Sequence, residues 1–160
     1  MAYLKYIVLI NLYKKSFFIV LNTLRGDLFF FNESFLSVIK YDIRKILNLF
    51  LPKSFDIVLI LDVLEHLKRK ESLKLLRDAE KIAKKAVIIE TPLGFIPQNI
   101  DIWKMGGDKY QTHRSSWDIR DFEVRGYKSF LRSYKMSNVK RHTKHTSNLN
   151  VKLINAIKTV

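Results

Sequence analysis

Phe55-Asp-Ile-Val-Leu-Ile-Leu-Asp-Val-Leu-Glu-His-Leu67 is the stretch that sets the fold class of this chain. It follows a polar turn and is apolar without a break over residues 57–61. A short apolar run with turn signals beside it is typical of a strand buried on both faces, and such strands belong to parallel sheets covered by helices. Ligands of these sheets bind beyond the carboxyl ends of the strands. Asp62, Glu65 and His66 directly follow that end, so we expect a site there.

The composition is that of a single globular domain. The chain has 160 residues, of which 48% are hydrophobic, enough to form a core. It has no cysteine, which excludes disulfides, thiolate catalysis and cysteine-ligated metal sites, and no other metal site is predicted. This composition suits the reducing cytoplasm, which is the location we expect.

The charge is strongly positive. The chain has 29 basic and 15 acidic residues, which give a formal net charge of +14. Such a charge predicts attraction to polyanions such as nucleic acid or an anionic membrane surface. A basic surface that serves solubility explains the same charge equally well, so both interpretations stay open.

The first part of the chain, residues 1–31, is rich in Ile, Leu, Phe and Tyr. We predict two buried strands, over residues 6–12 and 16–21, with residues 13–15 as the turn between them. A signal peptide is the alternative, but no small-residue cleavage site follows the apolar stretch. Lysines interrupt the segment, and a membrane span needs about 18 or more consecutive apolar residues, so no span is predicted.

A further strand, over residues 35–39, precedes a predicted helix. Asp42 is a good N-cap for that helix, whose apolar face consists of Ile43, Ile46, Leu47 and Phe50. Pro52 prevents the helix from continuing.

Residues 70–85 have the clearest amphipathic pattern of the chain. The apolar positions at helical spacing are Leu73, Leu76, Ala79, Ile82 and Ala83. The positions expected to face water are Lys74, Arg77, Asp78, Glu80, Lys81 and Lys84. A second apolar run, over residues 86–90, then predicts a strand. Strand, helix and strand of these lengths predict a parallel βαβ unit.

A long loop is predicted over residues 93–112, with bulky side chains at Phe95, Ile96, Ile102 and Trp103. Loops of this length are usually functional or disordered, and the aromatic content favours a lid over the site. A short helix is predicted over residues 117–124, with Ser116 as its N-cap and Gly126 beyond its end. A strand over residues 127–132 follows it.

The end of the chain carries positive charge only, because no acidic residue follows Glu123. Residues 136–150 are polar and rich in Ser, Thr, Asn and His, a composition that predicts a mobile segment. Residues 151–160 are expected to form a short closing strand or helix. We therefore predict one α/β domain over residues 1–134 and a basic C-terminal tail over residues 135–160.

Several short strings, in their order and spacing, resemble class I S-adenosylmethionine-dependent methyltransferases. The strings are Asp42-Ile-Arg-Lys-Ile46, Ser54-Phe-Asp-Ile-Val58, Leu61-Asp-Val-Leu-Glu-His-Leu67 and Val87-Ile-Ile-Glu-Thr-Pro92. The run Gly106-Gly-Asp-Lys-Tyr-Gln-Thr-His-Arg-Ser-Ser-Trp117 resembles a branch of small, type 11-like enzymes of that fold. The resemblance spans residues 37–127 and implies a Rossmann-like, mostly parallel sheet with flanking helices.

The resemblance implies S-adenosylmethionine as cofactor and four residues that bind it. Asp42 matches the family's acidic residue after the third strand, which meets the adenine amino group, and Ile43 would line the adenine pocket. A carboxylate suits these N–H donors, although Asp42 fits equally well as a helix N-cap. Asp62 and Val63 match the turn after the fourth strand, beside the methionine part of the cofactor.

Other matched positions concern the methyl acceptor. Thr91 and Pro92 match the end of the fifth strand, near the acceptor, and His66 is a further candidate substrate contact. His113 is a candidate general base and Arg114 a candidate ligand for an anionic acceptor. Structural roles fit these residues as well, with His66 as a packed core histidine and the other two as loop anchors.

The sequence departs from the family before residue 36. The family's first strand ends in a glycine-rich loop whose backbone approaches the cofactor without a Cβ in between. Here only Gly26 lies before Gly94, and the family's ribose-binding acid has no counterpart. Residues 1–35 are also too short for the family's first two strands and the helix between them. Truncation, a frameshift or divergence would each explain the difference.

Three hypotheses follow. The chain is an S-adenosylmethionine-dependent methyltransferase of unknown acceptor, or a non-catalytic protein of that fold that acts as a partner, or a nucleic-acid-binding protein that uses its basic tail. Tyr127, Phe130 and Tyr134 are the aromatic residues near the tail, which is weak support for base stacking.

Overall fold

The structure is a computed structural model that describes the backbone of residues 4–12, 16–22, 36–98, 111–140 and 146–160. Side chains are described for residues 41–98, 111–133 and 150–160. The predicted turn over residues 13–15 lies outside these ranges, as does most of the predicted lid, with Ile102 and Trp103.

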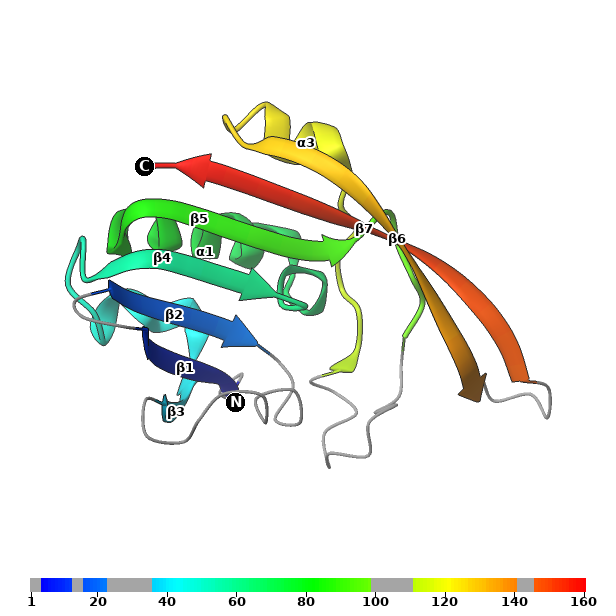
Figure 1. Ribbon diagram of the computed structural model, residues 1–160, viewed down its shortest axis with the longest axis horizontal. Coiled ribbons are helices and arrows are strands. Elements are labelled where there is room, and N and C mark those ends of the chain that lie inside the picture. The colour runs from blue at the N-terminus through cyan, green and yellow to red at the C-terminus, as the bar shows by residue number, and fades with distance from the viewer. Residues whose placement is uncertain (1–3, 13–15, 23–35, 99–110, 141–145) are drawn as a thin grey trace.

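In the described residues, seven strands form one sheet in the order β3-β1-β2-β4-β5-β7-β6 (Figure 1). The strands are β1 (Leu4–Leu12), β2 (Ser16–Asn22), β3 (Leu36–Asp42), β4 (Phe55–Leu61), β5 (Ala83–Pro92), β6 (Lys128–Lys140) and β7 (Thr146–Thr159). β2, β4 and β5 are parallel to one another, whereas β1 and β7 run against their neighbours. Two of the six neighbouring pairs, at the centre of the sheet, are parallel and the other four are antiparallel. The predicted α/β class with flanking helices is confirmed, with a mixed sheet whose parallel part is its centre.

The two predicted N-terminal strands are β1 and β2, and they form an antiparallel pair. Tyr6 lies opposite Asn22 and Leu12 opposite Ser16, so the two strands form a hairpin. An antiparallel pair needs only a short turn, whereas a parallel pair needs a crossover of a dozen or more residues. This difference explains how two strands fit into a segment too short for the family's first unit.

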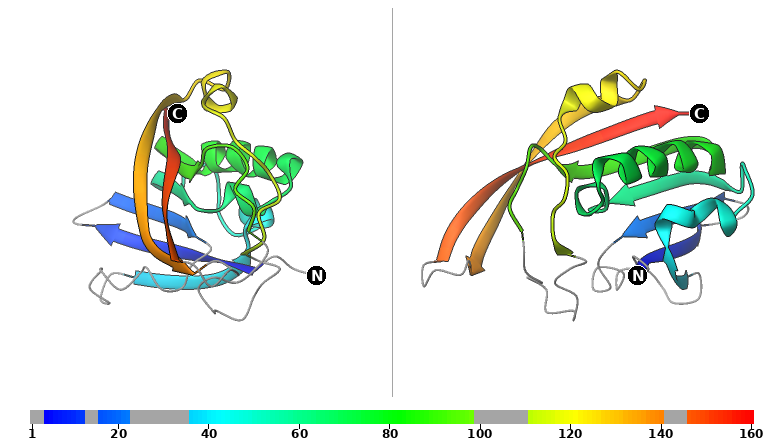
Figure 2. Two further views of the ribbon diagram at one scale, coloured as in Figure 1. Left: turned by 90° about the vertical axis from the view of Figure 1, so that its right-hand side faces the viewer. Right: turned by 180° about the vertical axis from the view of Figure 1, so that it is seen from behind.

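β4 is a strand as its apolar sequence predicts, but only one of its two faces is fully buried. It begins at Phe55 and ends at Leu61 as expected, and Val58 and Ile60 are fully buried. The alternate residues Ile57, Leu59 and Leu61 are only half-buried, so the prediction of burial on both faces is wrong for one face. Figure 2 shows the reason, since the described helices all lie over the same face of the sheet.

Helix α1 (Arg69–Ile82) covers the β4–β5 pair and confirms the predicted βαβ unit. Its buried face contains Leu75, Leu76, Ala79 and Ile82. Asp78 was expected to face water but is buried, where its carboxylate accepts a hydrogen bond from Lys74 one turn earlier. A buried carboxylate needs such a partner.

The 3-10 helix η3 (Ile43–Asn48) begins at Asp42, as predicted. The Asp42 carboxylate accepts the backbone N–H of Arg44 at 3.1 Å. The Arg44 side chain then bridges Asp42 at 2.7 Å and Glu71 of α1 at 2.8 Å. Although burial alone raises the pKa of Asp42, the hydrogen bonds and charge of Arg44 outweigh it and hold that pKa below its usual value.

Two expectations for the C-terminal part are corrected. Helix α3 (Ile119–Glu123) is capped by Asp118 rather than Ser116, because Trp117 forms a bridge with Gly94 and keeps the chain extended up to that point. The segment expected to be mobile lies in β6 and β7 wherever it is described, and the predicted domain boundary at residues 134 and 135 falls within β6. The physical reason is that β6 and β7 pair with each other along this segment, with Met136 opposite Leu149 and Val139 opposite Ser147. The end of β7, where a closing strand or helix was expected, is a strand that pairs with β5, from Ala86 opposite Thr159 to Pro92 opposite Leu153.

Aromatic and charged contacts join α3 to α1 and β7. Trp117 stacks on Phe122 with ring centroids 5.2 Å apart, and Phe122 meets Tyr127 edge to face. The Tyr127 hydroxyl donates to Glu80 at 2.9 Å, and Lys158 binds the other carboxylate oxygen at 3.0 Å. Burial, and then the charge of Glu80, raise the pKa of Tyr127, so it stays a donor.

Within the described residues, no helix is both long enough and apolar enough to cross a membrane.

We predict that Leu75→Ala lowers the free energy of unfolding by about 2–5 kcal/mol, because it leaves a cavity under α1. Leu51→Ala is the matched control, since Leu51 is 79% exposed, and it should change stability by less than about 0.5 kcal/mol. Urea unfolding followed by circular dichroism measures both. Equal losses in the two variants would contradict the packing of α1 on the sheet.

Asp42 gives a second prediction, for stability against pH. Asp42→Ala should cost about 0.5–2 kcal/mol near neutral pH, whereas Asp42→Asn keeps the cap and removes only the charge. Because the folded-state pKa is lowered from 3.8, the charge stabilises the fold above that value and the effect is lost as the pH falls through the folded-state pKa.

Urea unfolding of wild type and Asp42→Asn, near neutral pH and again well below pH 3.8, tests this. The stability difference between the two proteins should shrink at low pH. A difference that is the same at both pH values would show that the Arg44 pair does not stabilise the fold.

Candidate functional site

The candidate site lies at the edge of the sheet where β2, β4 and β5 end. These three parallel strands finish at Asn22, Leu61 and Pro92, on one side of the molecule (Figure 1). After β2 the chain continues to β3 on one side of β2, and it then returns to β4 on the other side. Ligands of open α/β sheets bind at such a reversal of strand order.

Asp62 lies at this edge with an unusual backbone conformation. Its φ of 50° is in the left-handed region, which Asp tolerates better than most residues. Its N–H donates to the Glu90 carbonyl at 3.2 Å, which fixes the turn after β4 against β5. Asp62 is half-buried, whereas the neighbouring Val63 is fully buried in the core.

Asp42 and Ile43 lie farther along the same edge, at the end of β3. β1 and β2 separate β3 from β4 in the sheet. Both oxygens of the Asp42 carboxylate accept hydrogen bonds from Arg44, and Ile43 is fully buried. The helix-capping role of Asp42 is therefore observed.

Glu65 is the centre of a buried network beyond β4. It lies in the 3-10 helix η4 (Leu64–His66) and is 3% exposed. Its carboxylate oxygen Oε2 accepts a hydrogen bond from the Thr91 hydroxyl at 2.9 Å. Its backbone carbonyl accepts the N–H groups of Arg114 at 2.6 Å and Ser115 at 3.1 Å. One residue thus joins η4, the end of β5 and the segment that follows the predicted lid.

Two histidines lie beside Glu65. His66 is 3% exposed, and its Nε2 is 3.7 Å from Glu65 Oε1. The His66 and His113 rings meet edge to face with centroids 4.7 Å apart. His113 Nδ1 lies 2.7 Å from the Ile96 carbonyl. Because a carbonyl oxygen only accepts, Nδ1 carries the proton, and a neutral His113 has its lone pair on Nε2.

Ser115 attaches the same segment to η4 a second time. Its hydroxyl donates to the Leu64 carbonyl at 2.9 Å and accepts from the Trp117 indole N–H at 3.1 Å. Both side chains are buried. The position of the segment over residues 113–117 is therefore fixed by backbone and side-chain contacts together.

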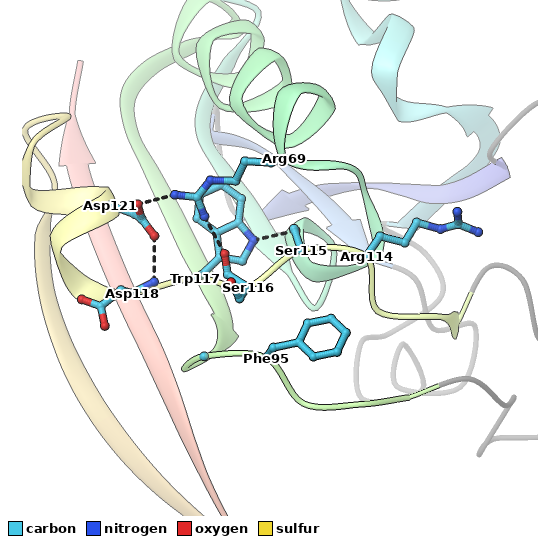
Figure 3. A pocket seen from close by; sticks show the side chains of 9 residues that line it. Arg69, Phe95, Arg114, Ser115, Ser116, Trp117, Asp118 and Asp121 are labelled. Atoms are coloured by element: carbon cyan, nitrogen blue, oxygen red, sulfur yellow. Dashed lines mark hydrogen bonds and ion pairs between the residues drawn. The ribbon is translucent and has the colours of Figure 1, made fainter.

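An open depression of about 640 Å³ lies next to this network (Figure 3). Its lining includes Arg69, Phe95, Arg114 and Trp117. The Arg69 guanidinium lies 3.9 Å from the centre of the Trp117 ring, donates to the Ser116 carbonyl at 2.5 Å and forms an ion pair with Asp121. Arg114 points away from this pair, and the Arg114 side chain is exposed.

The structure brings together some of the residues predicted from sequence and separates others. His66, Thr91, His113 and Arg114 all lie around Glu65, whereas Asp42 and Ile43 lie at the far end of the edge. Glu65 is among the polar residues expected at the end of β4, but the sequence does not predict its contacts with the other residues. Its acid–histidine dipeptide is a sequence signal, but its link to Thr91 spans 26 residues and leaves no local pattern.

Comparisons with known proteins give structural matches only. No family model matches the chain, and no curated protein matches its sequence. A crystal structure of a SAM-dependent methyltransferase from Archaeoglobus fulgidus is similar with a TM-score of 0.50 and 18% identity, over 87% of this chain and 74% of that one. Magnesium protoporphyrin IX methyltransferase from Synechocystis PCC 6803, with bound SAM, is similar with a TM-score of 0.41 and 18% identity, over 75% of this chain and 44% of that one.

At these identities the likeness concerns the fold. Together with the strand order and the parallel centre of the sheet, the Archaeoglobus match shows that this chain has the fold of class I S-adenosylmethionine-dependent methyltransferases.

Proposed function

We propose that this chain is an S-adenosylmethionine-dependent methyltransferase whose cofactor lies along the carboxyl edge of β3, β2 and β4. The observation that carries the proposal is the reversal of strand order between β2 and β4, where ligands of such sheets bind. The similarity to a methyltransferase of the same fold supports it. The acceptor is not identified by these observations.

The two carboxylates of the edge are suited to hold opposite ends of the cofactor. Asp42 and Asp62 end strands that are three places apart in the sheet, which is about 14 Å at the usual strand spacing. Carboxylates accept hydrogen bonds from amino and hydroxyl groups such as those of adenosine and methionine. Ile43 and Val63, the residues that follow these two carboxylates, are fully buried in the core and so anchor this edge of the sheet.

S-adenosylmethionine, when bound, supplies a methyl group on a positively charged sulfur, and transfer is an in-line displacement that depends on positioning. The acceptor must lose a proton if it attacks as an O–H or N–H group. We assign that role to His113, whose Nδ1–H donates to the Ile96 carbonyl, so that Nε2 is the nitrogen that would accept the proton. A histidine held by such a bond has a fixed orientation.

The adjoining depression is a suitable binding surface for the acceptor. Arg114 is exposed on its rim and offers a charge for an anionic group. Phe95 is 55% exposed in the same lining and offers an apolar face. An acceptor with both an anionic and an apolar part fits this combination.

Calorimetry with S-adenosylmethionine tests the cofactor. We expect saturable heat at millimolar cofactor, and a loss of affinity of about 10- to 100-fold in Asp62→Asn, because a hydrogen bond to a charged group is removed. Asn tolerates the left-handed backbone of this position, so the fold should be kept.

Glu123→Gln is the matched control, since it neutralises an exposed carboxylate on α3, and it should bind as the wild type does. The absence of heat from the wild-type protein at millimolar cofactor would refute the proposal.

A second candidate function, binding of single-stranded nucleic acid, is favoured by one face of β6. Lys128, Phe130 and Arg132 alternate along the strand, so they lie on one face, and all three are exposed. Phe130 is 59% exposed, between the two charges. Cations that bind phosphates, with an aromatic ring that stacks on bases, are the usual means of binding a single strand.

Filter binding of single-stranded RNA over a salt series tests this candidate. The logarithm of the binding constant should fall linearly with the logarithm of the salt concentration. The double variant Lys128→Gln with Arg132→Gln should make this slope shallower by the amount expected for the loss of about two phosphate contacts. The control is the double variant Lys84→Gln with Lys70→Gln, which removes two exposed lysines outside β6. It should lose less affinity for RNA than the β6 double variant does. Negligible retention at low salt would exclude this function.

A further inference from the structure

Glu65, His66 and His113 bring one carboxylate oxygen and two imidazole nitrogens together at the carboxyl edge of β4. One ligand atom from each residue lies within 4.8 Å of the others. Glu65 and His66 are buried and His113 is half-buried. We propose that these three residues form a binding site for a divalent transition-metal ion.

The hydrogen bond of His113 is the kind that metal-binding histidines make. Such histidines donate one ring N–H to a carbonyl or carboxylate, which directs the other nitrogen at the metal. His113 Nδ1 donates to the Ile96 carbonyl at 2.7 Å, and its backbone N–H donates to the Gln98 carbonyl at 3.0 Å. The first contact orients the ring, the second fixes the backbone that carries it, and Nε2 would be the nitrogen that binds the ion.

The spacing of Glu65 and His66 suits a shared ion better than a direct bond. Glu65 Oε1 and His66 Nε2 are 3.7 Å apart, which is too long for a hydrogen bond. Two ligands of a tetrahedral ion with bonds of about 2.1 Å lie about 3.4 Å apart. All three ligand atoms lie within 4.8 Å of one another, so side-chain movements of about 1 Å would bring them to one ion.

The Thr91 hydroxyl positions the carboxylate. It donates to Oε2 of Glu65 at 2.9 Å and leaves Oε1 as the oxygen nearest His66. Carboxylates that bind metals are typically held by such hydrogen bonds. Thr91 is fully buried, so this contact is shielded from water.

The backbone of the site is held in place before any ion binds. The Glu65 carbonyl accepts the N–H groups of Arg114 and Ser115, the two residues that follow His113. The Ser115 hydroxyl donates to the Leu64 carbonyl, which precedes Glu65. Ligands on such a fixed backbone lose little freedom on binding an ion.

The ligand atoms indicate the class of ion. Two imidazoles and one carboxylate suit Zn²⁺, Mn²⁺, Fe²⁺ or Co²⁺, whereas Ca²⁺ and Mg²⁺ prefer oxygen ligands alone. Three protein ligands leave at least one position for water or a substrate oxygen, as in catalytic rather than structural sites.

The site would also change the chemistry proposed for His113, a consequence that rests on the proposed methyl transfer. The Nε2 lone pair cannot bind an ion and accept a proton at once. An ion held by these three residues would supply a Lewis acid, which would lower the pKa of an acceptor hydroxyl and so take over the task proposed for His113. Metal binding itself is independent of methyl transfer and is tested without cofactor.

Titration of the purified full chain with Zn²⁺, followed by calorimetry, tests the site. We expect one ion per chain and a melting temperature raised by about 5–10 °C when free Zn²⁺ is about 100 times the dissociation constant. Co²⁺ in place of Zn²⁺ should give visible absorption from nitrogen and oxygen ligands. Thr91→Val should weaken binding about 10- to 100-fold, as loss of a supporting hydrogen bond does.

His113→Asn and Glu65→Gln should abolish stoichiometric binding, with folding checked by circular dichroism. His113 is half-buried, so its variant decides the test if the Glu65 variant does not fold. The control is a double variant, His142→Ala with His145→Ala, which removes the other two histidines of the chain and should bind Zn²⁺ normally.

The proposal is overturned if the wild-type protein binds no Zn²⁺, if His113→Asn binds as the wild type does, or if the His142 and His145 variant alone loses binding. A protein that binds Zn²⁺ but not S-adenosylmethionine would keep this proposal and refute the methyltransferase.

Discussion

Glu65 makes the interactions on which the arrangement of the functional edge depends. It is buried, and its carboxylate and carbonyl together reach Thr91 of β5 and the backbone of residues 114 and 115. A buried carboxylate is costly unless it has hydrogen-bond partners, so this position constrains its neighbours strongly. The segment after the predicted lid is held against η4 by these contacts and by Ser115. Without them His113 and Arg114 would lie on a surface loop with no fixed relation to β4.

The sequence predicts elements whose pattern is local. The strand over residues 55–61, the N-cap at Asp42 and the βαβ unit all depend on neighbours within one or two turns, and all are observed. The segment over residues 136–150 is different, because its composition is polar and its order depends on the pairing of β6 with β7, as of Met136 with Leu149. Composition therefore predicts mobility where pairing between β6 and β7 makes two strands. The choice between Ser116 and Asp118 as a cap likewise depends on the bridge between Gly94 and Trp117.

In the candidate site, too, local motifs are predictable from the sequence and long-range contacts are not. Thr91, His66 and His113 are each suggested by motifs, but the motifs do not say that all three meet at Glu65. The stacking of Arg69 on Trp117, with its ion pair to Asp121 across 52 residues, has no signal in the sequence at all. The absence of cysteine removes one class of metal site from consideration, yet histidines distant in sequence can still meet in space. Motifs thus find individual residues, and topology decides which of them act together.

The hairpin of β1 and β2 explains how the edge can keep its geometry without the family's first βαβ unit. β2 still lies parallel to β4, with Asn22 opposite Leu61, so the strand order still reverses beside Asp62. What the hairpin does not supply is a helix between its strands, and one face of β4 is correspondingly only half-buried. The backbone approach that a glycine-rich loop provides is needed where a Cβ would block the ligand. On the β4 side of this reversal of strand order, the left-handed conformation of Asp62 turns the chain away directly after the strand. The chain thus keeps β4 and the turn at Asp62 on one side of the reversal of strand order, whereas on the other side β2 comes from an antiparallel hairpin in place of the family's first βαβ unit.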